Sequence, residues 1–271
     1  MARGEKEQAC FSLVQQYLHT EVKYFGCSAQ DVDNIEKIFK NSFPNPQSSL
    51  FPDFIFENGF VEHFQISSGR NTKNGSEHKR DHSKFESDFD EGEKNFKEEL
   101  SKNPAFGECK TFSSTMHYKN HSYDNLVDSL KKSWTHHINS MQGYEGNKEI
   151  GIFLIEYNEM GLSMMEDCFA GCKSGLRYDD LHEQEHISDY RLSRDKNMLN
   201  YLYQQRDGIQ YIIYVCSHFI DIIATKNIPE ILKLLPFEYR IAPLHIMETH
   251  STFAVSVPNF EIKREETNDE T

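Results

Sequence analysis

The chain has 271 residues, with 20 phenylalanines, 13 tyrosines and a formal net charge of −14 at pH 7. Its aromatic content excludes a disordered chain, and its length suffices for one large domain. The acidic charge disfavours docking on phosphate backbones or anionic lipids through overall charge, although one basic groove is compatible with it. No run approaches the roughly 18 apolar residues of a membrane span, and the charged start is unlike an export signal. We therefore expect a cytoplasmic protein with no membrane segment, whose six scattered cysteines are reduced.

Hydrophobic periodicity and turn signals predict alternating helices and strands. In chain order we expect helices over 5–25 and 29–41, a β-hairpin over 52–67, an exposed polar loop over 68–82, helices over 83–102 and 122–143, a buried strand over 150–157, an irregular stretch over 160–190, a helix over 193–206, strands over 209–216 and 219–224, and a short helix over 228–235. This order predicts a single α/β domain over 1–260, with a mixed β-sheet flanked by helices, and a charged, frayed tail over 261–271.

Some of these elements carry specific signals. One face of the helix 122–143 is apolar, with positions that recur every three or four residues. These positions are Leu126, Leu130, Trp134, His137 and Met141. The nearly continuous apolar run 150–157 is typical of a strand that is buried on both faces of a sheet. Ser193 is expected to cap the helix that follows it.

The hairpin carries the residues of greatest chemical interest. Asn58-Gly59 lies between two apolar runs, and a type I′ turn centred on this pair needs positive φ at both residues. Such a turn pairs Ile55 with Glu62. It makes Asp53 and Glu62 diagonal neighbours, roughly 7 Å apart at the backbone. Both carboxylates can then reach one divalent cation between them.

The alternation of side chains along a strand separates the polar residues of the hairpin into two groups. Asp53 and Glu62 share one face, whereas His63 and Gln65 share the other. Exposed hairpins also commonly carry acidic residues on the solvent side, so an ordinary surface hairpin is the alternative interpretation.

Residues 52–68 resemble the metal-binding hairpin of the PD-(D/E)XK, restriction-endonuclease-like superfamily. In that family a Pro-Asp pair begins one strand, and an acidic residue, one spacer and a lysine follow on the next. Pro52-Asp53 matches the first part. If Glu62 takes the acidic position, Phe64 falls at the lysine position.

A second alignment places His63 at the acidic position and Gln65 at the lysine position, where some family members carry glutamine or another acid. The two alignments use opposite faces, so they exclude each other unless a β-bulge shifts the register. The resemblance implies a restriction-endonuclease-like core and Mg²⁺ or Mn²⁺ bound by Asp53 and Glu62. It also implies a nuclease whose candidate catalytic residues are Asp53, Glu62, His63 and Gln65. By analogy with nucleases that cut both strands, it implies a homodimer.

The resemblance leaves the source of the lysine open. Lys73 or Lys79 could supply it from the polar loop, and Lys131 or Lys132 from the helix that follows. Glu21 is a candidate further carboxylate on the first helix. If no lysine is supplied, the alternative is a catalytically inactive protein of nuclease fold that acts as a binding or partner module.

Two other patterns carry weaker functional signals. His182-Glu-Gln-Glu-His186 matches the His-Glu-x-x-His motif of zinc metalloproteases, in which two histidines on one helix face bind zinc. Its strongly acidic surroundings favour a polar surface loop instead. A basic patch can contact the phosphates of a nucleic acid, or it is simply a solvated loop. This patch comprises Arg70, Lys73, Lys79 and Arg80.

Overall fold

The computed structural model describes most of the chain, and its described residues form two compact units. Described are residues 4–20, 22–47, 50–72, 75–102, 109–118, 120–165, 187–235, 240–244 and 247–255. Unit 1 lies within Met1–Glu77 and Lys119–Ile246, and unit 2 within His78–Tyr118 and Met247–Thr271. The expected single domain over 1–260 stays a prediction, and the tail over 261–271 lies outside the described residues.

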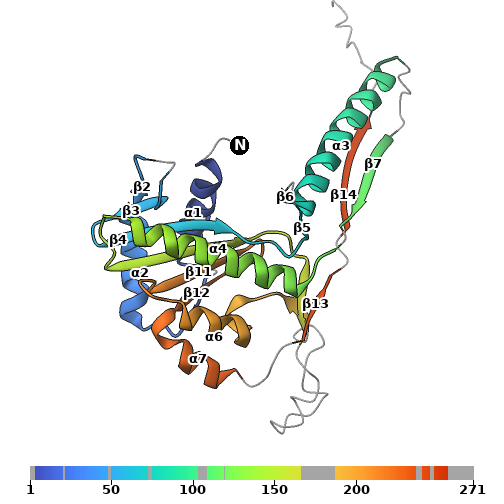
Figure 1. Ribbon diagram of the computed structural model, residues 1–271. Coiled ribbons are helices and arrows are strands. Elements are labelled where there is room, and N and C mark those ends of the chain that lie inside the picture. Colours follow the sequence, from blue (N-terminus) through green and yellow to red (C-terminus); the bar gives the residue numbers. More distant parts are fainter. Residues whose placement is uncertain are drawn as a thin grey trace, which may run out of the picture. The chain divides into compact units, whose positions relative to one another are not determined.

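A seven-stranded mixed sheet forms the centre of unit 1, in the order β1-β12-β11-β8-β4-β3-β2 (Figure 1). Its strands are β1 (Val22–Phe25), β2 (Phe43–Pro44), β3 (Phe54–Phe56), β4 (Gly59–Gln65), β8 (Ile150–Tyr157), β11 (Tyr211–Cys216) and β12 (Phe219–Ala224). β8 is parallel to both β4 and β11, whereas β2, β3 and β4 form an antiparallel meander. The predicted mixed sheet is therefore confirmed.

Helices cover both faces of this sheet (Figure 1). They are α1 (Glu5–Tyr17), α2 (Ala29–Asn41), α4 (Tyr123–Gly143), α6 (Lys196–Gln204), α7 (Ile228–Leu234) and the short 3-10 helices η3 (Leu192–Arg194) and η4 (Thr225–Asn227). One core cluster lies under α1 and α2, and the other under α4, α6 and α7. Ile152 of β8 belongs to the first cluster and Phe153 to the second, so this strand is buried on both faces as predicted.

The helix α4 matches its predicted apolar face. Leu126, Leu130, Trp134 and Met141 are all buried against the sheet. The indole nitrogen of Trp134 donates to the carbonyl oxygen of Gln205, 3.1 Å away, so the one polar atom of this side chain is satisfied.

Two expected elements are wrong in their bounds or caps. The first helix ends at Tyr17, and Val22–Phe25 instead forms β1, which pairs in parallel with the edge of β12. Asp195, not Ser193, caps α6, because its carboxylate accepts the amide of Met198 at 3.0 Å. Ser193 lies in the 3-10 turn before this helix.

The expectation of an exposed loop over 68–82 is also wrong, because this segment begins buried and ends inside a helix. Ser68 is fully buried. Short paired strands follow, and then α3 begins at Glu77. These strands are β5 (Asn71–Thr72) and β6 (Gly75–Ser76).

A separate three-stranded sheet in unit 1 consists of β9 (Leu162–Met165), β10 (Ile187–Asp189) and β13 (Arg240–Pro243).

Unit 2 consists of one long helix and a two-stranded ribbon. Its elements are α3 (Glu77–Lys102), β7 (Cys109–His117) and β14 (Met247–Val255), and the two strands are antiparallel. Phe89 and Phe96 of α3 contact the ring of Phe112 at centroid distances of 5.4 and 6.0 Å. Within the described ranges, no helix is both long enough and apolar enough to cross a membrane.

Candidate functional site

The register of the hairpin differs from the predicted one by two residues. Phe56 pairs with Gly59, so the turn residues are Glu57 and Asn58 instead of Asn58 and Gly59. Continued by one residue, this register sets Asp53 level with Glu62, where a diagonal arrangement was expected. Neither Asn58 nor Gly59 has a positive φ, so the expected type I′ turn is wrong.

Glycine is required at position 59 for a structural reason other than the turn. It pairs with Ile150 on the parallel strand β8, and a Cβ atom at this position would overlap the carbonyl oxygen of Ile150. Glycine is therefore required here for the close approach of two backbones and not for a turn. This requirement depends on β8, a strand that is far from Gly59 in the sequence.

A shift of two residues leaves the faces of the strand unchanged, because the side-chain period is also two. Glu62 contacts His137 of α4, with 2.7 Å between Oε1 and Nδ1. His63 and Gln65 point to the face covered by α1 and contact Glu156 there. The predicted separation of Glu62 from His63 and Gln65 is confirmed.

The structure brings the two predicted metal-binding carboxyl groups together. The backbone amide of Asp53 donates to Oε2 of Glu62 at 3.0 Å, and the amide of His63 donates to Oδ2 of Asp53 at 2.8 Å. Glu62 is 6% exposed and Asp53 is half-buried. Backbone hydrogen bonds therefore hold both carboxyl groups at the start of the hairpin.

The electrostatics of this pair are unfavourable without a cation. Burial raises the pKa of Asp53 to about 7, and the charge of Glu62 adds to this shift. Burial also raises the pKa of Glu62 to about 7, and Glu7 of α1 contributes in the same direction. Burial lowers the pKa of His137 to about 4, so this imidazole is neutral at pH 7 and supplies no positive charge to its neighbour Glu62. A divalent cation would compensate the excess negative charge.

A second group of polar side chains lies on the opposite face of the hairpin. Cys10 of α1, His63 of β4 and Glu156 of β8 each offer one donor atom, and these atoms lie within 4.8 Å of one another. Nε2 of His63 is 2.9 Å from Oε2 of Glu156, and the amide of Gln65 donates to the same oxygen at 2.6 Å. The two alignments considered for the motif thus correspond to two separate polar clusters.

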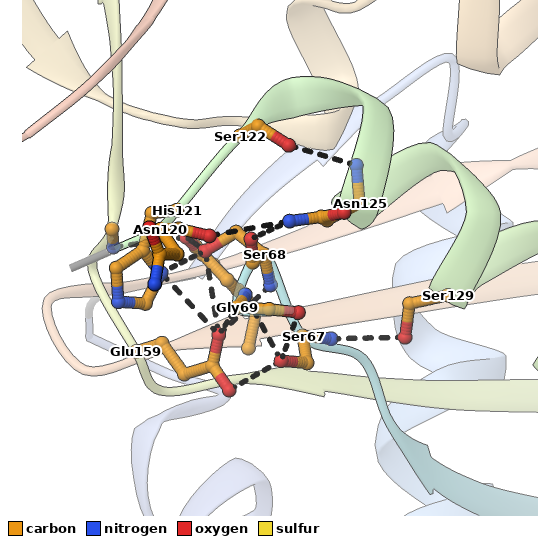
Figure 2. Close-up of polar contacts among 11 residues, drawn as sticks. Ser67, Ser68, Gly69, Asn120, His121, Ser122, Asn125, Ser129 and Glu159 are labelled. Atoms are coloured by element: carbon orange, nitrogen blue, oxygen red, sulfur yellow. Dashed lines mark hydrogen bonds and ion pairs between the residues drawn. The ribbon is translucent and has the colours of Figure 1, made fainter. Parts of the chain in front are cut away.

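A buried hydrogen-bond network fixes the end of β4 (Figure 2). The carboxylate of Glu159 accepts from the hydroxyl of Ser67 at 2.6 Å and from the backbone amides of Ser68 and Gly69 at 2.8 and 3.1 Å. The Ser68 hydroxyl contacts Nδ1 of His121 at 2.8 Å. This network ties β4 to the loop after β8 and to the start of α4, which explains why the expected exposed loop is buried.

The combination of Ser68, His121 and Glu159 is not arranged as a catalytic triad. In such a triad the serine and the acid contact different nitrogens of the imidazole. Here Ser68 Oγ and Glu159 Oε2 both lie on the Nδ1 side of His121, at 2.8 and 3.8 Å. Ser68 is also completely buried. We interpret the network as structural.

The structure does not place a lysine at the motif positions. Phe64 is buried and stacks on His137 at a centroid distance of 4.6 Å, and Gln65 occupies the alternative position. Lys131 and Lys132 are exposed on α4, and the ammonium group of Lys131 lies 5.1 Å from the ring centroid of Tyr201.

The described structure does not test the remaining predicted residues. Arg70 belongs to unit 1, whereas Lys79 and Arg80 belong to α3 in unit 2, so the basic patch stays a prediction. Four further residues of interest lie outside the described residues. These are Glu21, Lys73, His182 and His186.

Sequence reasoning missed three residues that the structure brings to the hairpin. Glu156 was detectable, because it is the one charged residue within an otherwise apolar strand. Glu7 and Cys10 had no such signal, because they lie on a helix whose contact with β4 is a tertiary feature. His137 was assigned to an apolar helix face, and a histidine at such a position is itself an indication of a polar partner.

Comparisons of this chain with protein-family models, with curated proteins and with solved structures give no match. The likeness to the PD-(D/E)XK superfamily therefore rests on the residues of the hairpin.

Proposed function

We propose that this chain is a metal-dependent nuclease with a restriction-endonuclease-like core, in which Asp53 and Glu62 hold Mg²⁺ or Mn²⁺. The observation that carries the proposal is the position of these two carboxyl groups: the amide of Asp53 donates to Oε2 of Glu62 at 3.0 Å, and burial raises the pKa of each carboxyl group to about 7. Hard divalent cations bind carboxylate oxygens by preference, so the donor set fits the proposed metals.

The arrangement of elements supports the same proposal. A helix precedes the antiparallel meander β2-β3-β4, α4 follows, and β8 then pairs in parallel with β4. This is the order expected from the resemblance, with Pro52-Asp53 immediately before β3 and Glu62 on β4.

The residues of the chain would act as follows. Asp53 and Glu62 bind the cation, and the backbone amide of His63 orients the Asp53 carboxylate. His137 orients Glu62 through its 2.7 Å contact. Bound Mg²⁺ or Mn²⁺ supplies an activated water and stabilises the charge that develops on the phosphodiester. Gln65 is directed at Glu156 on the other face, so its part is to position β8 and not to touch the metal.

The test is a cleavage assay on plasmid DNA, single-stranded DNA and RNA, with Mg²⁺, Mn²⁺ or a chelator. We expect metal-dependent cleavage of at least one substrate, and a fall to the rate without metal in Asp53→Asn and Glu62→Gln. Asp33→Asn, a change at an exposed position of α2, is the matched control and should keep full activity. Cleavage that persists in the chelator, or in both variants, contradicts the proposal.

A second candidate is a catalytically inactive protein of the same fold that binds nucleic acid or a protein partner. The observation that favours it is the buried Phe64 at the lysine position of the motif. Calorimetry separates the two candidates. Binding of metal or nucleic acid by the wild-type protein, without cleavage of any of the three substrates, indicates the inactive form.

A further inference from the structure

We propose that Cys10, His63 and Glu156 form a second metal site, specific for zinc-class ions, on the face of the hairpin opposite to Asp53 and Glu62. The three residues come from three different elements, α1, β4 and β8. Their donor atoms lie within 4.8 Å of one another. This proposal is independent of the nuclease proposal, because it uses other side chains and another class of metal.

Packing brings these residues together. Cys10 is on the buried side of α1, and His63 and Glu156 point to the same face from neighbouring parallel strands, with Gln65 paired to Glu156. The site is nearly closed to solvent. Cys10 is 4% exposed, and the side chains of His63 and Glu156 are 4% and 13% exposed. Buried donors of this kind are held in place by the core and need little ordering to bind an ion.

The donor set selects the class of metal. One sulfur, one imidazole nitrogen and one carboxylate oxygen suit zinc, whereas Mg²⁺ and Ca²⁺ prefer oxygen alone. Zinc bonds of about 2.0–2.3 Å place the donors of a tetrahedral site about 3.3–3.8 Å apart. The observed separations extend on both sides of this range, from 2.9 Å between His63 and Glu156 to within 4.8 Å for the whole set, so metal binding requires side-chain rotations. Three protein ligands leave a fourth position for water or a substrate.

Zinc binding would change the protonation of the cluster. Burial, reinforced by the charge of Glu156, raises the pKa of the Cys10 thiol far above its ordinary range, so the thiol is neutral without a metal. Although burial opposes it, hydrogen bonds from His63 and Gln65 keep the pKa of Glu156 below its ordinary value. A zinc ion would displace the thiol proton to solvent, and the imidazole of His63 would then carry its proton on Nδ1 and bind through Nε2. The resulting thiolate and carboxylate neutralise the ion.

Hydrogen bonds from neighbouring side chains hold the carboxylate of Glu156 in place. Gln65 donates to Oε2 of Glu156 at 2.6 Å, and Asn158 donates to its other carboxylate oxygen. Such outer hydrogen bonds hold a ligating carboxylate in one orientation. In the absence of metal, the His63 proton takes the position between Nε2 and Oε2 that the cation would occupy.

The test uses the full chain, stripped with a chelator and titrated with Co²⁺ as a spectroscopic probe for zinc. We expect a thiolate-to-cobalt charge-transfer band that saturates at one Co²⁺ per chain and that Zn²⁺ then abolishes. Cys10→Ala should lose this band. The matched control Cys216→Ala, at another buried cysteine in β11, should keep it.

Two further variants test the other ligands. His63→Gln and Glu156→Gln should each weaken Co²⁺ binding by about 100-fold or more, because loss of an outer hydrogen bond alone costs 10–100-fold. Circular dichroism verifies that each variant is folded. For any variant that fails to fold, X-ray absorption spectroscopy of the zinc-loaded wild-type protein replaces the titration, and it should show a sulfur ligand on the bound zinc.

The outcomes that overturn the proposal are specific. They are a wild-type protein without the charge-transfer band, a band that survives Cys10→Ala, or a bound zinc ion without a sulfur ligand. Asp53→Asn should keep the cobalt band, since its carboxylate lies outside the cluster. Failure of the nuclease assay therefore leaves this test unaffected, and the reverse also holds.

Discussion

Replacement of Asp53 by asparagine should make the protein more stable at alkaline pH, although it removes a proposed metal ligand. The ordinary pKa of this carboxyl group is 3.8, and burial with the charge of Glu62 raises it to about 7. The difference is about three pH units, and each unit corresponds to about 1.4 kcal/mol. The ionised carboxylate therefore costs the folded state about 4 kcal/mol at pH 8. Asparagine has nearly the same shape and can still accept the amide of His63.

The pH dependence follows from the sign of this shift. Well below its unfolded pKa of 3.8, Asp53 is protonated in both the folded and the unfolded chain, and it contributes no penalty. Between pH 4 and 7 the unfolded chain releases its proton first, so the free energy of unfolding of the wild type falls as pH rises. Asp53→Asn removes this contribution. The two proteins should differ by only about 0.5 kcal/mol at pH 4 and by up to about 4 kcal/mol at pH 8.

Urea denaturation in a chelating buffer at pH 4 and pH 8, followed by circular dichroism, measures both values. Asp33→Asn is the control, because Asp33 is exposed, and it should change neither value. Added Mg²⁺ should stabilise the wild type and not Asp53→Asn. The reasoning is refuted if Asp53→Asn is no more stable than the wild type at pH 8.

Three further substitutions test the packing that positions the site. Gly59→Ala should destabilise the fold by about 3 kcal/mol or more in urea denaturation, because its methyl group overlaps the carbonyl oxygen of Ile150. A loss below about 1 kcal/mol would contradict the close approach of the two strands. Ser68→Ala should cost about 1–3 kcal/mol, since it leaves His121 without its 2.8 Å contact in a buried network. Gly161→Ala should cost about 1–3 kcal/mol, because its methyl group meets the ring of His121. An unchanged thermal midpoint in either variant would argue against the network.

The sequence was most informative where a local pattern has only one stable solution. The apolar face around Leu130 and Trp134 predicted α4, and the continuous apolar run predicted the buried strand β8. The same patterns predicted a mixed sheet with helices on both faces. These outcomes depend on a periodicity within a few neighbouring residues, which the chain carries whatever its tertiary structure.

The hairpin shows where local reasoning was insufficient. Asn58-Gly59 is a strong turn signal, yet Gly59 serves the approach of β8, and the turn moves to Glu57 and Asn58. The predicted faces survived only because the register moved by two residues and not by one. A glycine in a sequence can be required for a turn or for the close approach of two backbones. Here the parallel partner strand β8 shows that Gly59 is required for the close approach.

The sequence by itself determined the general α/β architecture and the hairpin with Asp53 and Glu62 as candidate ligands. The tertiary structure alone decided that Glu62 faces His137, and that Cys10 and Glu156 join His63 on the other side. The physical reason is that helix packing and parallel strand pairing connect residues that are distant in the sequence, and no local periodicity encodes such contacts.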